Sequence, residues 1–341
     1  MQNKENTFKI LSIDGGGIKG LYSATILKEF EKHFKCNISD QFDMICGTST
    51  GGILALALSL KIPAEKICEF YIEEGKNIFP GGRYFNLCGI KLPKRFFRQI
   101  FWGGKYSDKH LIKALKKVFG TKIIGDSNNL LCIPSYTITE ARPFVFKYDH
   151  SEGNLDRDNE VKMVDVALAT SSAPTFFPLA EIEDYDNKQF IDGGVWANNP
   201  TLVGLLEALD YFVGVGKNFD NLKIMSISSL SVKGGKPTGL KRQRSFFRWK
   251  NDLFETSMNG QSLFIDFFMS KISETSSIDI NYIRIPSIEI SSEQIDYIQL
   301  DIATKEALDM IKGKGKDQAN IYKKKEEVEI FFQEKKQYKT R

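Results

Sequence analysis

Apolar and polar positions follow two alternating patterns along the first sixty residues. Residues 8–13 are mainly apolar, and apolar positions then recur at every third or fourth residue between 21 and 34. The first pattern predicts a buried strand and the second an amphipathic helix. A second apolar run ends at Cys46, and residues 51–60 are apolar on nearly every face of the helix that they predict. This order predicts a βαβ unit, the building block of a parallel sheet.

The same patterns continue to about residue 230. They predict helices that begin at Pro63, at residues 107 and 163 and after Asn198-Asn199-Pro200, and strands at 130–135, 144–147, 188–194 and 222–229. We therefore expect an α/β protein with a central, mostly parallel sheet and one domain over residues 8–230. Residues 231–341 are expected to form a mainly helical extension packed on it, with a helical stretch at 263–269, a strand at 278–286 and a polar, solvated helical tail after 311.

The overall composition is that of a globular protein with a sizeable core, at 42% hydrophobic and 26% charged residues. The longest apolar runs are far shorter than the roughly 20 residues of a bilayer-spanning helix, and residues 1–7 show no signal peptide, so we expect a cytoplasmic protein. The five cysteines form no C-x-x-C pair, which argues against a zinc site and a disulfide framework. No side-chain spacing predicts a metal ion or a cofactor.

Two basic, aromatic-rich stretches depart from this composition. Residues 75–107 carry seven Lys and Arg, residues 221–251 carry eight, and neither stretch contains an acidic residue. Because the rest of the chain is net acidic, the two stretches suggest anionic partners: a membrane surface, a nucleotide or nucleic acid. The first is an insertion between core elements, and it fits a lipid-facing surface, a pocket cap or a covering subdomain with buried aromatic rings.

A glycine-rich loop, Asp14 to Gly20, joins the first strand to the first helix. Gly15, Gly17 and Gly20 fit the G-x-G-x-x-G pattern of dinucleotide sites, but no acidic residue ends the next strand to hold a ribose. A Walker A loop is excluded as well, because Lys19 is followed by glycine. What remains is a row of backbone N–H groups at a helix N-terminus, which binds anions and would stabilise an oxyanion beside a nucleophile.

Gly47-Thr48-Ser49-Thr50-Gly51 places a serine between a strand and a helix. This G-x-S-x-G pattern is typical of a nucleophile elbow, so Ser49 is the candidate nucleophile. A hydrolase triad in the usual chain order needs a histidine after the acid, but all three histidines precede Asp192. Asp192 lies between a strand and Gly193-Gly194, and its carboxylate can accept the serine proton directly. We therefore expect a Ser49–Asp192 dyad, although without Ser49 this aspartate would be an ordinary turn residue.

Together these motifs give the chain a resemblance to patatin-like phospholipases over about residues 8–230. The resemblance rests on Asp14 to Gly20, Gly47 to Gly51, Asp192-Gly193-Gly194 and the loop Ala173-Pro174-Thr175-Phe176-Phe177-Pro178. It implies a three-layer patatin fold and a lipid acyl hydrolase of the phospholipase A type. It also implies that Ser49 attacks the ester, that Asp192 is the base, and that the oxyanion hole is lined by Gly15, Gly16 and Gly17. Ser228-Ser229-Leu230 departs from the family, in which many members have a glycine-containing turn there.

A narrower resemblance concerns regulation. Asp14 to Leu21, together with the stretch Gly194 to Pro200, is similar to bacterial patatin-like effectors of anti-phage signalling. This resemblance implies activation by a cyclic oligonucleotide, such as a cyclic dinucleotide, and degradation of phospholipid at the inner membrane surface. One basic stretch would then bind the nucleotide and the other the membrane. DNA and RNA are not expected as partners, and a homo-oligomer stays open.

Two functions of other classes also stay open. A nucleotide sensor with an inert serine would bind nucleotide at its glycine loop and show no activity toward acyl esters. A soluble hydrolase of small esters would show no rise in rate when its substrate forms a lipid interface.

Overall fold

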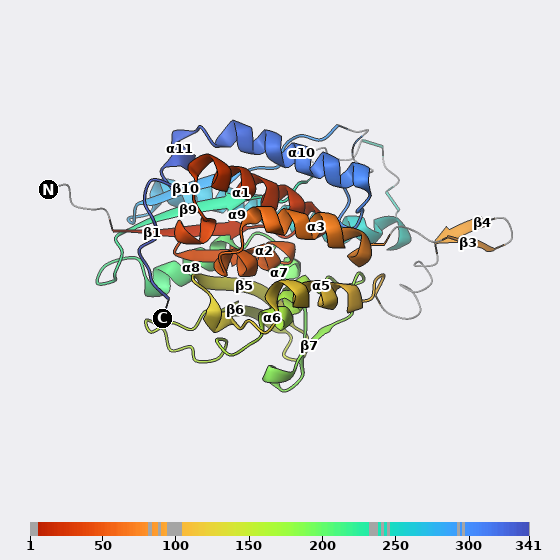
Figure 1. Ribbon diagram of the computed structural model, residues 1–341, viewed down its shortest axis with the longest axis horizontal. Helices are drawn as coiled ribbons and strands as arrows, with labels where there is room; N and C mark the ends of the chain where they lie inside the picture. The colour runs from red at the N-terminus through yellow and green to blue at the C-terminus, as the bar shows by residue number, and fades with distance from the viewer. Residues whose placement is uncertain are drawn as a thin grey trace.

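The structure is a computed structural model, and it describes residues 6–80, 84–87, 90–93, 104–231, 238–239, 242–243, 246–291, 294 and 297–340 (Figure 1). The expected basic stretches at 75–107 and 221–251 therefore lie in part outside the described residues. Within the first of them, β3 (Tyr84–Leu87) and β4 (Ile90–Pro93) pair as a two-stranded antiparallel sheet.

A single large sheet forms the centre of the molecule. In the described part of the chain it has eight strands, in the order β10 (Ile280–Ile285), β9 (Asn221–Ile227), β1 (Thr7–Ile13), β2 (Met44–Gly47), β5 (Leu130–Thr137), β8 (Lys188–Asp192) and β7 (Ala180–Ile182), with β6 (Arg142–Lys147) paired to β5. The five strands from β10 to β5 are parallel to one another, whereas β6, β7 and β8 pair antiparallel. The expected α/β class with a mostly parallel sheet is confirmed.

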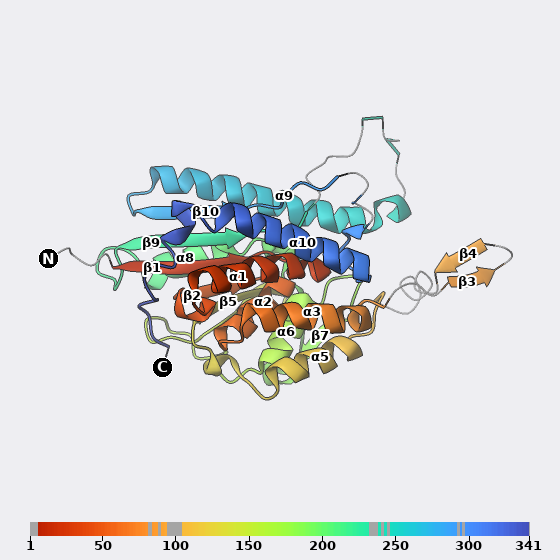
Figure 2. The same ribbon diagram turned by 45° about the horizontal axis from the view of Figure 1, so that its top comes forward.

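Helices cover both faces of this sheet, which gives three layers (Figures 1 and 2). One layer contains α1 (Gly20–Phe34), α2 (Thr50–Ser59), α3 (Ala64–Ile78), α5 (Lys109–Phe119), α6 (Met163–Ser171) and α10 (Lys305–Tyr322). The other contains α7 (Gly194–Ala197), α8 (Thr201–Tyr211) and α9 (Phe246–Thr275). A short helix, α11 (Glu326–Glu329), follows α10.

The centre of the core is α2, which packs on β1, β2 and β5. All ten of its residues are buried, as expected for a helix that is apolar on every face. It is flanked by α1 and α6, so the turn that precedes α2 is held by packing on several sides. The nucleophile candidate at that turn therefore sits on rigid structure.

The tail after residue 311 is not the solvated helix that its lysine and glutamate content predicts. α10 packs along α1, and its Ile311 and Ala319 are fully buried. Farther on, Phe331 is fully buried beside Phe42, and its carbonyl accepts a hydrogen bond from Lys9 Nζ at 3.1 Å. The high lysine and glutamate content predicted a solvated helix because the few apolar residues that pack on the core are widely spaced among charged ones.

The helix predicted at 263–269 is part of a much longer one, α9, which spans 30 residues. Three large apolar side chains in this part of the helix are exposed: Leu263 at 70%, Phe264 at 64% and Phe267 at 63%. Apolar residues therefore occur on both faces of α9, and no single apolar stripe marks the helix in the sequence.

Candidate active site

The proposed site lies at the carboxyl edge of the sheet. β1 and β2 are in register with Ile13 opposite Gly47, so the glycine loop after β1 and the serine turn after β2 leave the sheet side by side. Antiparallel pairing of β5 and β8 places Ser135 opposite Asp192, at the end of β8. This edge is where ligands bind in open α/β sheets.

Ser49 occupies a strained turn between β2 and α2. Its backbone has φ 56° and ψ −125°, a conformation that non-glycine residues rarely adopt. The flanking glycines permit the close approach of backbone segments: a Cβ on Gly47 would lie 2.1 Å from the Gly51 carbonyl oxygen, and one on Gly51 would lie 2.3 Å from that of Ile13. The glycines of G-x-S-x-G are thus required by packing, as in a nucleophile elbow.

The structure brings Ser49 and Asp192 together. Ser49 Oγ donates a hydrogen bond of 2.6 Å to Asp192 Oδ2, and the Gly194 N–H donates one of 2.7 Å to Asp192 Oδ1. The exposed fraction of Asp192 is only 2%. Burial raises the pKa of this carboxyl from 3.8 to about 7, and the hydrogen bonds from Ser49 and Gly194 oppose the rise. A carboxylate with a pKa near neutrality is well suited to act as a general base.

Thr170 holds the serine turn in place from the other side. Its Oγ1 accepts a hydrogen bond from the Ser49 N–H at 2.9 Å and donates one to the Pro134 carbonyl at 2.6 Å. Three elements, α2, α6 and β5, are joined in this way directly behind the nucleophile. Sequence analysis missed this residue, because a threonine inside an apolar helix pattern gives no chemical signal of its own.

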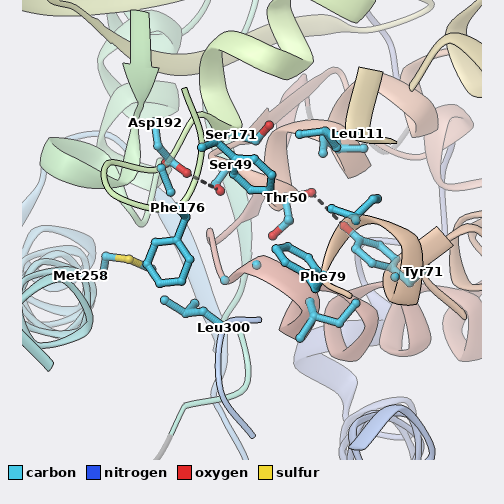
Figure 3. A pocket seen from close by; sticks show the side chains of 18 of the residues that line it. Ser49, Thr50, Tyr71, Phe79, Leu111, Ser171, Phe176, Asp192, Met258 and Leu300 are labelled. Atoms are coloured by element: carbon cyan, nitrogen blue, oxygen red, sulfur yellow. Dashed lines mark hydrogen bonds between the residues drawn. The ribbon is translucent and has the colours of Figure 1, made fainter. Parts of the chain in front are cut away.

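An apolar pocket opens in front of the dyad (Figure 3). Ser49 and Asp192 lie on one wall, and most of the remaining lining is aromatic or aliphatic, including Phe79, Phe176, Phe177, Tyr71, Leu111, Met258 and Leu300. The open volume inside is about 50 Å³, which is room for only a few water molecules. Phe176 and Phe177 belong to the loop that the sequence singled out, whereas Met258 and Leu300 come from the C-terminal region that was hard to interpret.

The glycine loop divides between two cavities. Gly16 and Gly17 line the apolar pocket with Ser49, whereas Gly15 lines a separate polar cavity behind the loop. The Gly15 N–H is moreover taken up by the Asn198 carbonyl at 3.0 Å. This hydrogen bond argues against an oxyanion role for the Gly15 N–H, and the expectation that Gly15 also lines the oxyanion hole stays a prediction. A pattern of three adjacent glycines could not show that the chain turns between the first and the second.

The histidines lie outside the site, as the sequence suggested. His150 is buried, and its Nε2 lies 3.2 Å from Glu207 Oε1, in contact with Tyr211 and Phe212. His33 and His110 are exposed, on α1 and α5. None of the three lines the pocket of Ser49.

Within the described residues, no three or more His, Cys, Asp or Glu side chains are grouped so that they could hold a metal ion. Among the helices of this part of the chain, none combines the length and the hydrophobicity of a membrane-spanning segment.

Comparison with known proteins gives matches along most of the chain. A family model described as patatin-like phospholipase matches residues 11–205. A Pseudomonas aeruginosa protein named "cGAMP-activated phospholipase" is 32% identical over 91% of this chain and 87% of its own length. An Escherichia coli protein of the same name is 29% identical over 95% of this chain and 92% of its own. "Patatin-like protein 1" of Arabidopsis thaliana is 28% identical over 90% of this chain and 80% of its own.

Proposed function

The chain belongs to the patatin-like phospholipase family and is a lipid hydrolase, and on this basis we propose that it cleaves acyl esters of membrane phospholipids with Ser49 as nucleophile and Asp192 as base. The observation that carries the assignment of roles is the 2.6 Å hydrogen bond between the two side chains at the wall of an apolar pocket. An acyl chain is the part of a phospholipid that such a pocket accepts.

The first half of the reaction transfers the acyl group to the enzyme. Ser49 Oγ attacks the ester carbonyl carbon while its proton passes to Asp192 Oδ2, and the carbonyl π electrons move onto the oxygen. When the tetrahedral intermediate collapses, the C–O bond to the glycerol breaks, and the proton on Asp192 passes to the departing alkoxide oxygen. The products of this half are a lysophospholipid and an acyl ester on Ser49. Water, deprotonated by Asp192, then releases the fatty acid by the same route.

We place the oxyanion of this intermediate at the glycine loop. Gly16 and Gly17 are the loop residues that line the pocket with Ser49, and Gly17 begins a short 3-10 helix, η1 (Gly17–Lys19). In the hydrogen-bond network of the described residues neither of these two N–H groups has an acceptor, whereas that of Gly15 does. Free N–H groups aimed at a developing negative charge are the usual source of oxyanion stabilisation.

Release of fatty acid from phospholipid vesicles, measured under conditions in which the unsubstituted enzyme is active, tests the roles of the two residues. Ser49→Ala and Asp192→Asn should each abolish release. Ser59→Ala is the matched control, because it removes a buried hydroxyl at the other end of α2, one that donates to the Leu56 carbonyl and does not line the pocket. Release by Ser49→Ala at the rate of the unsubstituted enzyme would refute the assignment and leave a serine that is inert.

We further propose that a cyclic nucleotide switches the enzyme on. Two of the relatives above are named as cGAMP-activated phospholipases, and the pocket in front of Ser49 encloses only about 50 Å³ of open volume. A nucleotide that favours a wider pocket would ease the entry of an acyl chain and so raise the rate of hydrolysis. The rate of vesicle hydrolysis should be low for the enzyme without nucleotide and should rise with one member of a panel of cyclic nucleotides. The same rate without nucleotide and with every member of the panel would contradict regulation.

The finer specificity follows from product analysis. Vesicles of a phospholipid with different acyl chains at its two positions will show which ester is cleaved, and hence whether the A-type activity is A1 or A2. We place the reaction at the inner membrane surface, so the rate should rise when a short-chain substrate passes from monomers to micelles. No rise would indicate a hydrolase of small soluble esters instead.

A further inference from the structure

A second cavity lies directly behind the glycine loop. Its volume is about 460 Å³, within the range of small-molecule binding sites. Its walls come from five places in the chain: the loop itself, Asn198, the segment after β9, α9 and the end of β10. Met258 of α9 lines both this cavity and the apolar pocket of Ser49.

Three buried polar atoms, on residues that line this cavity, lack hydrogen-bond partners among the described residues. They are Asn198 Oδ1, Ser228 Oγ and Ser229 Oγ, on residues whose exposed fractions are 4%, 7% and 7%. A buried polar atom without a partner costs about 1–3 kcal/mol, and few occur in native proteins. Three of them around one cavity indicate a site built for a polar ligand.

The chemistry of the walls defines the ligand. Asn198 Nδ2 already donates to Ser262 Oγ at 3.0 Å, so the free atom of this amide, Oδ1, can only accept. Asp266 accepts from the Tyr282 hydroxyl at 2.8 Å and has capacity for further donors. These groups suit the N–H and O–H donors of a base and a ribose.

The same cavity offers a cation for a negatively charged group. The exposed fraction of Lys19 is 7%, and its nearest carboxylate oxygen, on Glu255, is 3.9 Å away. Lys19 therefore forms only a long ion pair, beyond hydrogen-bond distance, and its ammonium has room to bind a phosphate oxygen as well. Arg284, in contrast, is fully engaged by Asp14 through hydrogen bonds of 2.9 and 2.5 Å. The cavity thus combines acceptors for a nucleoside with an available cation.

From this combination we propose that the polar cavity behind the glycine loop binds a nucleotide unit of a cyclic dinucleotide, and that binding there controls the oxyanion loop. The inference rests on the proposed activation by a cyclic nucleotide, and it adds the site and the route of control.

The route is short, because the cavity and the apolar pocket share the loop as a wall. Asn198 accepts the Gly15 N–H through its carbonyl, and Ser229 packs so closely on Gly16 that a Cβ there would overlap its Oγ. A ligand that bonds to the side chains of Asn198 and Ser229 therefore acts on the residues that position Gly16 and Gly17. On the opposite wall, α9 contributes Glu255 and Ser262 to the cavity and Phe254 to the apolar pocket.

Calorimetric titration of the full chain with cGAMP, cyclic di-GMP and cyclic di-AMP tests the inference. Ser228→Val removes one unpartnered hydroxyl, and Asn259→Trp fills the cavity from its exposed rim on α9. Thr256→Trp is the matched control, because Thr256 is exposed on the same helix and lines neither cavity. We expect the Kd of the nucleotide that binds to rise at least tenfold in the first two variants and to stay unchanged in the control.

The outcomes separate the two proposals. Unchanged binding in both cavity variants would overturn the location of the site and leave activation standing. No binding of any of the three nucleotides to the unsubstituted chain would overturn activation and the site together. Hydrogen exchange on the unsubstituted chain gives a test without substitutions: the bound nucleotide should slow exchange at residues 228–231 and 255–266, and unchanged exchange there would overturn the location.

Discussion

Replacing Asp192 by asparagine should stabilise the protein as it removes the proposed activity. Burial raises the pKa of this carboxyl from 3.8 to about 7, which means that the folded protein holds a proton that the unfolded chain releases between these two values. Stability therefore falls as the pH rises through this window, and it stays low above it. Each pKa unit corresponds to about 1.4 kcal/mol, so the ionised carboxylate costs the folded state up to about 4 kcal/mol above pH 8.

The asparagine side chain of the variant would have the same shape, could accept from the Gly194 N–H and donate to Ser49 Oγ, and would carry no charge to bury. The variant and the original protein should thus have the same melting temperature near pH 4. Toward pH 8 the two melting temperatures should separate, with that of the variant on the order of 5 °C higher. Thermal unfolding followed by circular dichroism from pH 4 to 9 measures this. Other buried carboxyls titrate alike in both proteins, so the difference isolates Asp192.

Ser49→Ala provides an internal check on the same curve. It removes a hydrogen bond that favours the carboxylate, so the pKa of Asp192 in the folded state should rise further, and the loss of stability, which still begins near pH 4, should extend to higher pH. A melting difference between Asp192→Asn and the original protein that is constant from pH 4 to 9 would refute the assignment of a raised pKa to Asp192.

Three further predictions concern the same site. Because Asp192 must be ionised to accept a proton, kcat/KM should fall tenfold per pH unit below about pH 7 and level off above it in a pH–rate profile; a level profile from pH 5 to 9 would contradict its role as base. Thr170→Val removes the hydroxyl that bonds to the Ser49 N–H and the Pro134 carbonyl, so it should lower the free energy of unfolding in urea by about 2–4 kcal/mol and reduce kcat/KM. Thr170→Ser keeps the hydroxyl and should leave both quantities near their original values. Equal losses in the two variants would show that the hydroxyl is not responsible. Gly51→Ala should abolish soluble expression, because its Cβ would clash with the end of β1. Gly260→Ala, in open space on α9, is the control and should raise the free energy of unfolding by about 0.5–1 kcal/mol. A folded Gly51→Ala variant would show that the turn tolerates a Cβ.

The elements around the dyad could be predicted because each has a clear pattern of apolar residues and ends at a glycine-rich turn that contains a serine or an aspartate suited to catalysis. The helix α6 begins at residue 163, as predicted, and the helix after Ser49 is shifted by a single residue at each end from the predicted 51–60. The pairing of Ser49 with Asp192 followed from the order of motifs and from the absence of a histidine after the acid. That inference needed no knowledge of the intervening chain.

The surroundings of the dyad could not be predicted because they depend on contacts between segments far apart in sequence. The Leu300 carbonyl accepts the Ile18 N–H at 2.9 Å and closes one side of the glycine loop, yet nothing in the sequence near residue 300 points to a pocket. The division of Gly15 from Gly16 and Gly17 likewise depends on Asn198 and Ser229, which approach from other strands and loops. Tertiary packing, and not local preference, decides such positions.

The most direct measurement of the central claim is covalent capture of the nucleophile. The purified protein is incubated with a long-chain alkyl fluorophosphonate, which forms a stable bond to an activated serine oxygen, and the modified residue is located by peptide mass spectrometry. The account predicts a single adduct on Ser49, absent in Ser49→Ala and formed much more slowly in Asp192→Asn, with Ser59→Ala labelled at the original rate. An adduct on another residue, or labelling of Ser49 at an unchanged rate without the Asp192 carboxylate, would contradict it.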